Sequence, residues 1–294
     1  MVLGELCMNL TVVVPTRNRP DFAKQLVKDL NDWDCEVIVV DDNSQQPFIA
    51  DGARVITNRH RLGGSESWNV GCRYAKHDWL LLLADDLVPS PGMARYIERL
   101  LPTLKPQDII GFRIVGFNNL GSRTVKLPYR NTVASRILNI TFGVDVGPHT
   151  GASRFTTAAM VIHSEFFALL GGFDFRTYAG NGFREESDLQ WRGRKMGGNL
   201  IYIEDPFFQH LNVPGGYQKG RSENDSYYMR NQTIFAFRTS PIASPVLIVG
   251  FGAWLVARGL PVPTLVRGVA QGLSVVISHI KSQGLRNSSE NKVK

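Results

Sequence analysis

The stretch DWLLLLADDLVPSPG, residues 78–92, sets four consecutive leucines directly before two adjacent carboxylates, Asp85 and Asp86. A short apolar run of this kind predicts a strand that is buried on both faces of a parallel sheet. Two neighbouring carboxylates at the mouth of such a strand repel each other unless a cation or hydrogen-bond donors neutralise them. The stretch therefore predicts a buried strand that ends at a polar site.

Two earlier segments repeat this design. LTVVVPT, residues 10–16, is a β-branched run that ends in a polar loop, and a helical pattern covers 21–32. EVIVVDDNS, residues 36–44, is a second strand that ends in acids. A short strand over 53–58 and a helix over 66–76 precede the leucine strand. This alternation predicts an α/β fold whose first strands are parallel.

Polar groups follow three of these strands, as Thr16-Arg17-Asn18, Asp41-Asp42 and Asp85-Asp86. In open α/β sheets ligands bind beyond the carboxyl ends of the strands, so we expect these groups in one cleft. Taken alone, Asp42-Asn43-Ser44 is also typical of a turn or a helix N-cap. A hard divalent cation bridging to phosphates would balance the paired acids. A dinucleotide or P-loop site is disfavoured, because no GxGxxG follows the first strand and no Walker lysine is present.

Composition limits the class of protein. The chain has 294 residues, of which 43% are hydrophobic, enough for a sizeable core. Residues 238–294 carry seven Lys or Arg against one acid, a net +6 of the total +7, which leaves +1 on the first 237 residues. Three cysteines without a CxxC pair, and an N-terminus without a signal-peptide pattern, predict a cytoplasmic protein with free thiols.

The chain resembles the family-2 glycosyltransferases with the GT-A fold. The matching stretches occur in the family's order over residues 10 to 237, and they are TVVVPTRNRP, EVIVVDDNS, GGSESWNVGCRYAKHDWLLLLADDLVPSPG, GGFDF, REESDLQWRGRKMGG, PFFQH and YYMRNQTIFAF. The resemblance implies a Rossmann-like mixed central sheet flanked by helices. It implies a catalytic domain over 1–237, with a nucleotide-binding half over about 1–105 and an acceptor half over about 106–237. Residues 238–294 would form a C-terminal helical extension.

The resemblance also implies an inverting transfer of a sugar from a nucleotide-diphosphate sugar, with a UDP-sugar favoured and Mn²⁺ or Mg²⁺ as cofactor. Asp42 would read the nucleobase. The nucleotide-binding residues would be Pro15, Thr16, Arg17, Asn18, Asp41, Asp42, Gly64, Asn69, Asp85 and Asp86.

The metal motif Asp-x-Asp of the family falls on Ala84-Asp85-Asp86, so alanine replaces its first acid and Asp86 keeps the metal role. A lone histidine such as His210, after a predicted strand over 199–210, is more often structural. The resemblance makes His210 the second metal ligand, and an imidazole favours Mn²⁺ slightly. Arg230 would add positive charge near the leaving phosphate.

Three acids, Glu185, Glu186 and Asp188, precede a helical pattern. Acids in a first helical turn are common, because the helix dipole favours them, so a structural role is equally open. The resemblance implies that Glu186 is the general base, which removes the proton of an acceptor hydroxyl. Glu185 would orient the loop, and Asp188 would grip the acceptor or a neighbouring arginine.

The tail has two helical patterns. Residues 240–257 are charge-free but broken by Pro and Gly, which favours a surface-buried or interfacial segment. Residues 264–281 form an amphipathic pattern whose polar positions are Arg267, Gln271, Ser274, Ser278 and Lys281. This helix packs on the catalytic domain or on a second copy in a homo-oligomer, or it docks on an anionic membrane surface. Nucleic acid is disfavoured, since basic and aromatic residues do not interleave.

Two functions follow from these patterns. The first is an active hexosyl- or deoxyhexosyltransferase of cell-envelope glycan biosynthesis, peripheral on the inner face of the membrane, with a glycan or lipid-linked glycan as acceptor. The second is a catalytically silent GT-A-like protein that binds a nucleotide sugar or scaffolds a membrane assembly. Ala84 favours the second function, whereas the joint presence of Asp86, Glu186 and His210 favours the first.

Overall fold

The computed structural model describes residues 8–116, 159–178, 180, 183–211, 221–257 and 259–290, without the side chains of 221–225 and 282–290. Its elements are β1 (Leu10–Thr16), α1 (Pro20–Leu30), η1 (Asn31–Trp33), β2 (Glu36–Asp41), β3 (Arg54–Thr57), α2 (Gly64–Cys72), β4 (Trp79–Leu83), β5 (Leu87–Pro89), α3 (Met93–Leu100), η2 (Leu101–Thr103), β6 (Asp108–Gly116), β7 (Ala159–His163), α5 (Ser164–Leu169), α6 (Glu185–Lys195), β8 (Asn199–His210), α7 (Arg221–Thr239), α8 (Ser244–Ala257) and α9 (Val262–Glu290).

The chain divides into two compact units. Of the described elements, the first unit holds the sheet and the helices from α1 to α6, and the second holds α7, α8 and α9. The last segment of the second unit begins at Lys219, so α7 belongs with the two tail helices. The boundary that we expect after residue 237 falls inside α7, close to its end.

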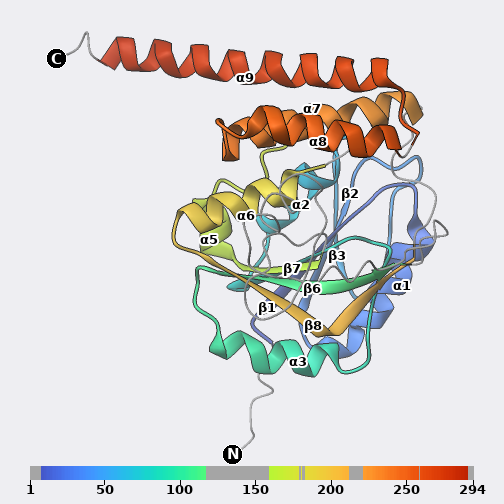
Figure 1. Cartoon of the computed structure of the whole chain (residues 1–294). Helices are drawn as coiled ribbons and strands as arrows, with labels where there is room; N and C mark the ends of the chain where they lie inside the picture. Colours follow the sequence, from blue (N-terminus) through green and yellow to red (C-terminus); the bar gives the residue numbers. More distant parts are fainter. Residues whose placement is uncertain are drawn as a thin grey trace, which may run out of the picture. The chain divides into compact units, whose positions relative to one another are not determined.

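The described strands of the first unit form one eight-stranded sheet in the order β3-β2-β1-β4-β7-β6-β8-β5 (Figure 1). β1 is central among the parallel strands, with β2 on one side and β4 on the other. Beyond β4 the sheet becomes mixed, because β7 runs antiparallel to both β4 and β6. This arrangement confirms the predicted α/β class with a mixed central sheet flanked by helices.

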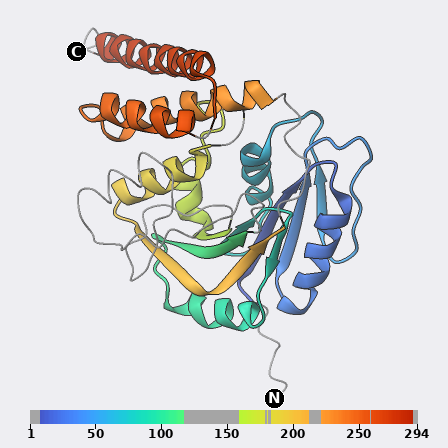
Figure 2. The same ribbon diagram turned by 45° about the vertical axis from the view of Figure 1, so that its right-hand side comes forward.

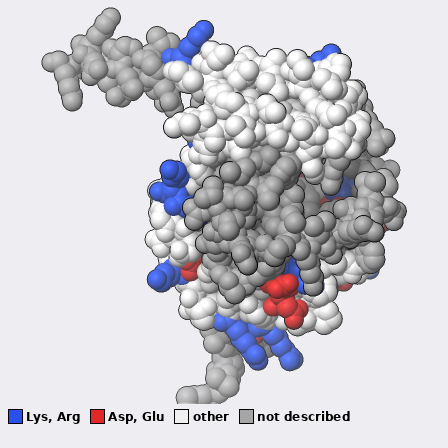
Figure 3. Space-filling view, in the orientation of Figure 1, with Lys and Arg blue, Asp and Glu red and all other residues white. Residues whose placement is uncertain are grey.

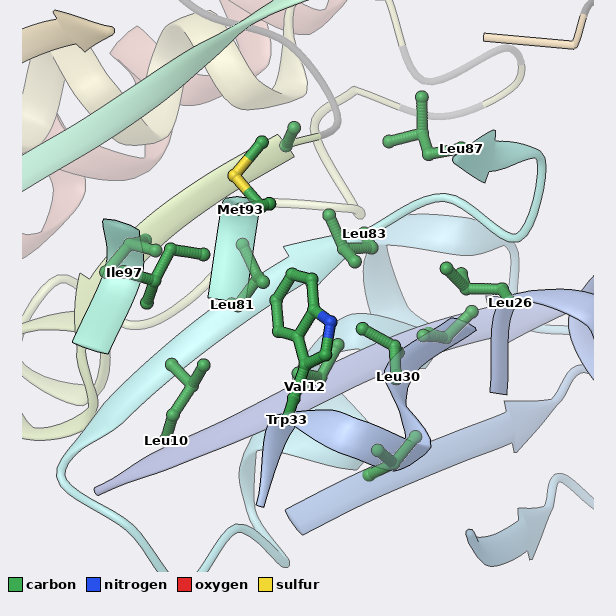
Figure 4. Close-up of a cluster of buried hydrophobic side chains, with 14 of the residues drawn as sticks. Leu10, Val12, Leu26, Leu30, Trp33, Leu81, Leu83, Leu87, Met93 and Ile97 are labelled. Atoms are coloured by element: carbon green, nitrogen blue, oxygen red, sulfur yellow. The ribbon is translucent and has the colours of Figure 1, made fainter. Parts of the chain in front are cut away.

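The leucine run of β4 is buried because both faces of the sheet are covered. Leu81 and Leu83 point into one core, in which Figure 4 shows them near Leu26 of α1 and Met93 of α3. Leu80 and Leu82 belong to the opposite core, which contains residues of α2, α5 and α6. Figure 2 shows α3 on one side of the sheet, with α5 and α6 on the other. Because side chains alternate along a strand, only a continuous apolar run fills both cores.

The second unit is a small helical assembly. α9 lies very close to α7, since a Cβ atom on Gly268 would lie 2.4 Å from the backbone oxygen of Ser226. A Cβ atom on Gly272 would similarly lie 2.7 Å from Cβ of Thr233. α8 completes the unit through Phe251, whose ring stacks on Phe183. The two glycines thus fix which face of α9 packs against α7.

Candidate active site

The site begins where β1 and β4 end side by side. β1 ends at Thr16, and Asp85 lies two residues beyond the end of β4. The Thr16 hydroxyl donates a hydrogen bond of 2.8 Å to Oδ2 of Asp85. Both side chains are buried, so this contact lies in a region of low polarity. The parallel pairing of the two strands therefore brings together two predicted site residues that are 69 positions apart.

Arg19 clamps the two acids that follow β4. Its Nη2 lies 2.6 Å from Oδ1 of Asp85, and its Nη1 donates a hydrogen bond of 2.9 Å to Oδ2 of Asp86. The residue precedes the first turn of α1, which places the guanidinium beside the neighbouring strand end. The arginine lies in the stretch PTRNRP, where no sequence pattern assigns it a role. A planar guanidinium fork suits two carboxylates, so Arg19 is the cation that balances the paired charge within the described residues.

The ionised form of the Asp85 carboxyl remains unfavourable despite its contact with Arg19. The pKa of the Asp85 carboxyl is raised from 3.8 to about 6, mainly by burial and to a smaller extent by the neighbouring Asp86 charge. The Arg19 charge and the Thr16 hydrogen bond oppose this rise. A buried acid with a raised pKa at the mouth of a sheet is typical of a functional site.

His210 reaches Asp86 through strand pairing. β5 runs antiparallel to the end of β8, with Leu87 opposite His210. The backbone N–H of Leu211 also donates to the Asp86 carbonyl at 3.0 Å. As a result, Nε2 of His210 lies 3.5 Å from Oδ1 of Asp86. The two predicted metal ligands are thus neighbours, although no group of three or more His, Cys, Asp or Glu side chains in the described ranges is arranged to hold a metal.

The side chains of Asp86 and His210 are of the types that bind a divalent cation. An imidazole nitrogen and a carboxylate oxygen are both ligands of Mn²⁺, and the Asp86 oxygen that faces His210 is not the one that Arg19 contacts. Two protein ligands leave the remaining positions to donor phosphates or water. Ala84, at the first position of the Asp-x-Asp motif, packs instead against the apolar core.

The acids after β2 are held by their own loops. Asp41 accepts hydrogen bonds from the backbone N–H groups of Ser44 and Phe48, each at 3.1 Å. Asp42 accepts from the N–H groups of Leu62 at 2.6 Å and Gly63 at 2.9 Å. The amide of Asn58 adds a bond of 3.1 Å to Asp42, a contact that no sequence pattern indicated. Both acids therefore shape the loops around the strand end, as the turn interpretation allows.

The other predicted nucleotide-binding residues also lie around these loops. Asn18 has a positive φ of 53°, and its side-chain oxygen accepts a bond of 2.8 Å from the Gln45 N–H. Pro15 is paired with Val40 inside the sheet. Arg17 is half-buried in the loop after β1, and Gly64 begins α2.

Asn69 has a structural role in the described residues. Its side-chain oxygen accepts a hydrogen bond of 2.8 Å from the N–H of Phe173, and its Nδ2 donates one of 3.0 Å to the carbonyl of the same residue. This pairing anchors the GGFDF stretch, in which a Cβ atom on Gly172 would lie 2.5 Å from Oδ1 of Asn69.

The three acids at the start of α6 occupy different environments. Glu185 is 5% exposed, and its Oε2 lacks a hydrogen-bond partner among the described residues. Burial, followed by the charges of Glu186 and Asp174, raises the pKa of the Glu185 carboxyl well above its usual value. Glu186 is only half-buried.

Asp188 is fully buried and accepts a bond of 2.7 Å from Nε of Arg192. Arg192 also donates to the carbonyls of Leu170 and Gly172. Of the two roles expected for Asp188, the structure shows the contact with a neighbouring arginine. Arg192, held by Asp188, thus ties α6 to the loop that carries GGFDF.

Arg230 lies in the second unit, on α7. Its Nη1 donates hydrogen bonds to the carbonyl of Thr177 at 3.0 Å and to Oδ1 of Asn231 at 2.7 Å. Burial lowers the pKa of this guanidinium from its usual value. The assignment of Arg230 to a leaving phosphate stays a prediction.

Comparison with known proteins identifies the family. The model of the glycosyl transferase family 2 matches residues 11–160, which include β1, β2, β4 and the paired acids. The chain belongs to this family. The chain is 28% identical over 208 residues to the pre-mycofactocin glycosyltransferase of Mycobacterium tuberculosis, an alignment that covers 66% of this chain and 41% of that protein. An uncharacterized glycosyltransferase of Haemophilus influenzae is 38% identical over 111 residues, which are 35% of this chain and 37% of that protein.

This family-2 glycosyltransferase chain thus spans about two fifths of the length of these curated relatives. Solved structures show the same fold. TarS 1–349 of S. aureus in complex with UDP-GlcNAc has a TM-score of 0.59 at 13% identity, over 91% of this chain and 81% of that chain. The mannosyltransferase PcManGT of Pyrobaculum calidifontis, in complex with GDP-Man and Mn²⁺, has a TM-score of 0.53 at 16% identity, over 94% and 80%. The predicted GT-A fold is confirmed.

Proposed function

We propose that the protein transfers a sugar, with inversion, from a nucleotide-diphosphate sugar to an acceptor hydroxyl. The observation that carries the proposal is the pair of buried acids after β4, clamped by Arg19 and adjacent to His210. Keeping two carboxylates together in a poorly hydrated place is unfavourable for folding and is explained by a ligand that needs them. The TarS and PcManGT structures contain UDP-GlcNAc and GDP-Man respectively, which supports a nucleotide-sugar donor.

Within this proposal, the loops after β1 and β2 bind the nucleotide. Asp42 is held rigidly by Leu62, Gly63 and Asn58, so its carboxylate is oriented before the donor arrives. A preoriented carboxylate loses little conformational entropy when it accepts a hydrogen bond from a base N–H, such as N3–H of the uracil that we propose. The loop around Asn18 and Ser44 would enclose the same nucleotide.

Asp86 and His210 would hold a divalent cation, Mn²⁺ or Mg²⁺. When bound there, the cation supplies positive charge that stabilises the departing nucleoside diphosphate. The protein contributes the preset spacing of 3.5 Å between the two ligand atoms. Arg19 balances Asp85 and the second oxygen of Asp86, so the site keeps its shape before a donor binds.

Glu186 is the general base in this scheme. It is more exposed than Glu185 and lies at the first turn of α6, where an acceptor hydroxyl has access to it. Glu185 is a positioning residue, because it is buried and its raised pKa favours the neutral acid. Asp188 and Arg192 fix the start of the helix and thereby the position of both glutamates.

The acceptor that we propose is a cell-envelope glycan or lipid-linked glycan, with the enzyme on the cytoplasmic face of the membrane. This part of the proposal rests on the composition of the tail. The sugar would be a hexose or a deoxyhexose.

The test compares Glu186→Gln with the matched variant Glu185→Gln. A panel of UDP-sugars, screened by thermal shift with Mn²⁺, supplies the donor, and single-turnover release of UDP measures transfer. Glu186→Gln keeps the shape but loses basicity, so donor affinity should stay the same while transfer falls by about 10² or more. Glu185→Gln should slow transfer less.

A capping role predicts a different result. If the acids only stabilise the helix, both variants lose about 1 kcal/mol of unfolding free energy and transfer at the wild-type rate per folded molecule. A wild-type rate in Glu186→Gln would move the base to Asp188 or Glu185.

A second candidate function is a catalytically silent nucleotide-sugar-binding protein or membrane scaffold. Ala84 is the observation that favours it, because one acid of the metal motif is missing. This candidate predicts donor binding without UDP release from any sugar of the panel, whether Mn²⁺ is present or not.

A further inference from the structure

The helix α8 is apolar on two opposite faces. Leu247, Phe251 and Leu255 are buried, and the last two belong to the hydrophobic core of the second unit. Val246 and Val249, on the other side of the helix, are 70% and 71% exposed. A helix that packs on a protein and otherwise faces water carries polar residues on its outer face. The outer face of α8 has none of the charged residues that this rule predicts.

The helix α9 also has an exposed apolar face. Its buried face carries Gly268 and Gly272, whose close approach to α7 fixes the rotation of the helix. Beside that face lies an exposed apolar stripe, which consists of Val262, Val266, Ile277 and Ile280. The third face carries the polar series from Arg267 to Lys281. The exposed stripe therefore results from a fixed packing rather than from a freely rotating helix.

Charge along α8 and α9 is almost entirely positive, because α8 carries no charged residue and the one acid of α9 is its last residue, Glu290. No Asp or Glu occurs from residue 226 through 289, and six basic residues do, at 230, 238, 258, 267, 281 and 286. Figure 3 shows an uncharged area over the described part of α8 and α9, with blue basic atoms at its margin and no red atoms on it. An apolar area bordered only by basic residues complements a surface of acyl chains and anionic headgroups.

The dimensions favour a helix that lies on a bilayer. α8 has 14 residues, which at 1.5 Å per residue gives about 21 Å, less than the roughly 30 Å of a hydrocarbon core. Of the helices that the structure describes, none is long and apolar enough to cross a membrane.

We propose that the outward faces of α8 and α9, here the α8–α9 surface, dock on an anionic bilayer. The α8–α9 surface consists of Ile242, Val246, Val249, Val256, Val262, Val266, Ile277 and Ile280. The inference rests on the proposed function and deepens it. A lipid-linked acceptor lies in the membrane, so an enzyme that docks on the bilayer can reach it. Its observations come from the second unit alone.

The experiment measures binding to vesicles by co-sedimentation, with the full chain. Vesicles of phosphatidylcholine alone are compared with vesicles that contain 30% phosphatidylglycerol, about the anionic content at which basic segments bind. The wild type should bind the anionic vesicles, and raising NaCl from 0.1 M to 0.5 M should weaken binding by roughly tenfold, because salt screens the basic margin. Val246→Asp/Val249→Asp should lower binding by about tenfold or more, since it places two charges on the apolar face.

The matched control is Ile49→Asp/Leu169→Asp, which changes two equally exposed residues of the first unit, at 73% and 66%. This control should bind within about twofold of the wild type. Circular dichroism and melting temperature verify that both double variants fold. Equal binding of the Val246→Asp/Val249→Asp protein and the wild type would overturn the inference. A dimer in solution that this variant dissociates, without vesicle binding by the wild type, would assign the surface to a second copy instead.

Glu186→Gln separates this inference from the proposed function. The variant should sediment with vesicles like the wild type. A protein that binds vesicles but releases no UDP overturns the transferase proposal and retains the docking surface. A protein that transfers but binds no vesicles overturns the docking surface alone.

Discussion

Replacing Asp85 with asparagine should make the protein more stable at neutral pH. The pKa of this carboxyl rises from 3.8 to about 6 in the folded chain, mainly through burial. Between these values the folded state binds more protons than the unfolded state, so the free energy of unfolding falls as pH rises and the loss is complete above about pH 6. A shift of about two units corresponds to about 3 kcal/mol. Asparagine mimics the neutral acid: its oxygen can face Arg19 while its amide N–H donates to the Thr16 hydroxyl, which can accept as well as donate.

The assay is urea unfolding in EDTA at pH 4.5 and pH 7.5, because a bound cation would add its own charge. The gain of Asp85→Asn over the wild type should be about 1 kcal/mol at pH 4.5 and approach about 3 kcal/mol at pH 7.5. Asp51→Asn, at an exposed position, is the control and should stay within about 0.5 kcal/mol of the wild type. A gain in unfolding free energy that is equal at both pH values, or a loss at pH 7.5, would refute the reasoning. Either result would show that the ionised Asp85 carboxylate does not destabilise the folded protein.

Two further predictions concern the ligands. Asp42→Ala should weaken UDP binding about tenfold or more in calorimetry, and it should lower the unfolding free energy by about 1–3 kcal/mol because it leaves the N–H groups of Leu62 and Gly63 unpaired. Unchanged UDP affinity would remove Asp42 from the donor site. His210→Ala and Asp86→Ala should each abolish the stimulation of UDP release by Mn²⁺ and lower Mn²⁺ affinity in calorimetry. Full wild-type activity in EDTA would show that the metal assignment is wrong.

The strand framework of the first unit was predictable from sequence. A continuous apolar run is stable only between two covered faces, and the runs at 10–16, 36–41 and 79–83 are the strands β1, β2 and β4. Parallel neighbours bring their carboxyl ends to one edge of the sheet, which explains why Thr16 and Asp85 meet. At these three strands the hydrophobic pattern of the sequence agrees with the observed order and direction of the strands in the sheet.

Side-chain partners were harder to predict, because they depend on how distant loops pack. Arg19 was visible in PTRNRP, but only the neighbouring positions of β1 and β4 show that its fork spans both acids. The roles of Asp41 and Asn69 in holding loops likewise depend on backbone N–H groups, which have no sequence signature. The sequence around His210 does not itself place the residue near Asp86. The family resemblance implied this placement, and the pairing of β5 with β8 produces it by joining two distant segments.

This arrangement explains why alanine occupies position 84, the first position of the metal motif. Its side chain packs on the same apolar core as Leu81 and Leu83, so an acid at this position would direct a charge toward hydrocarbon unless the strand end changed its course. The structure instead gathers the negative charge on Asp85 and Asp86, one step further into the turn, where Arg19 and Thr16 can reach it. A third carboxylate would add repulsion to a pair that one guanidinium already has to balance. The loss of the first acid is therefore compatible with the donor site that we propose, in which His210 would supply the ligand that the motif lacks.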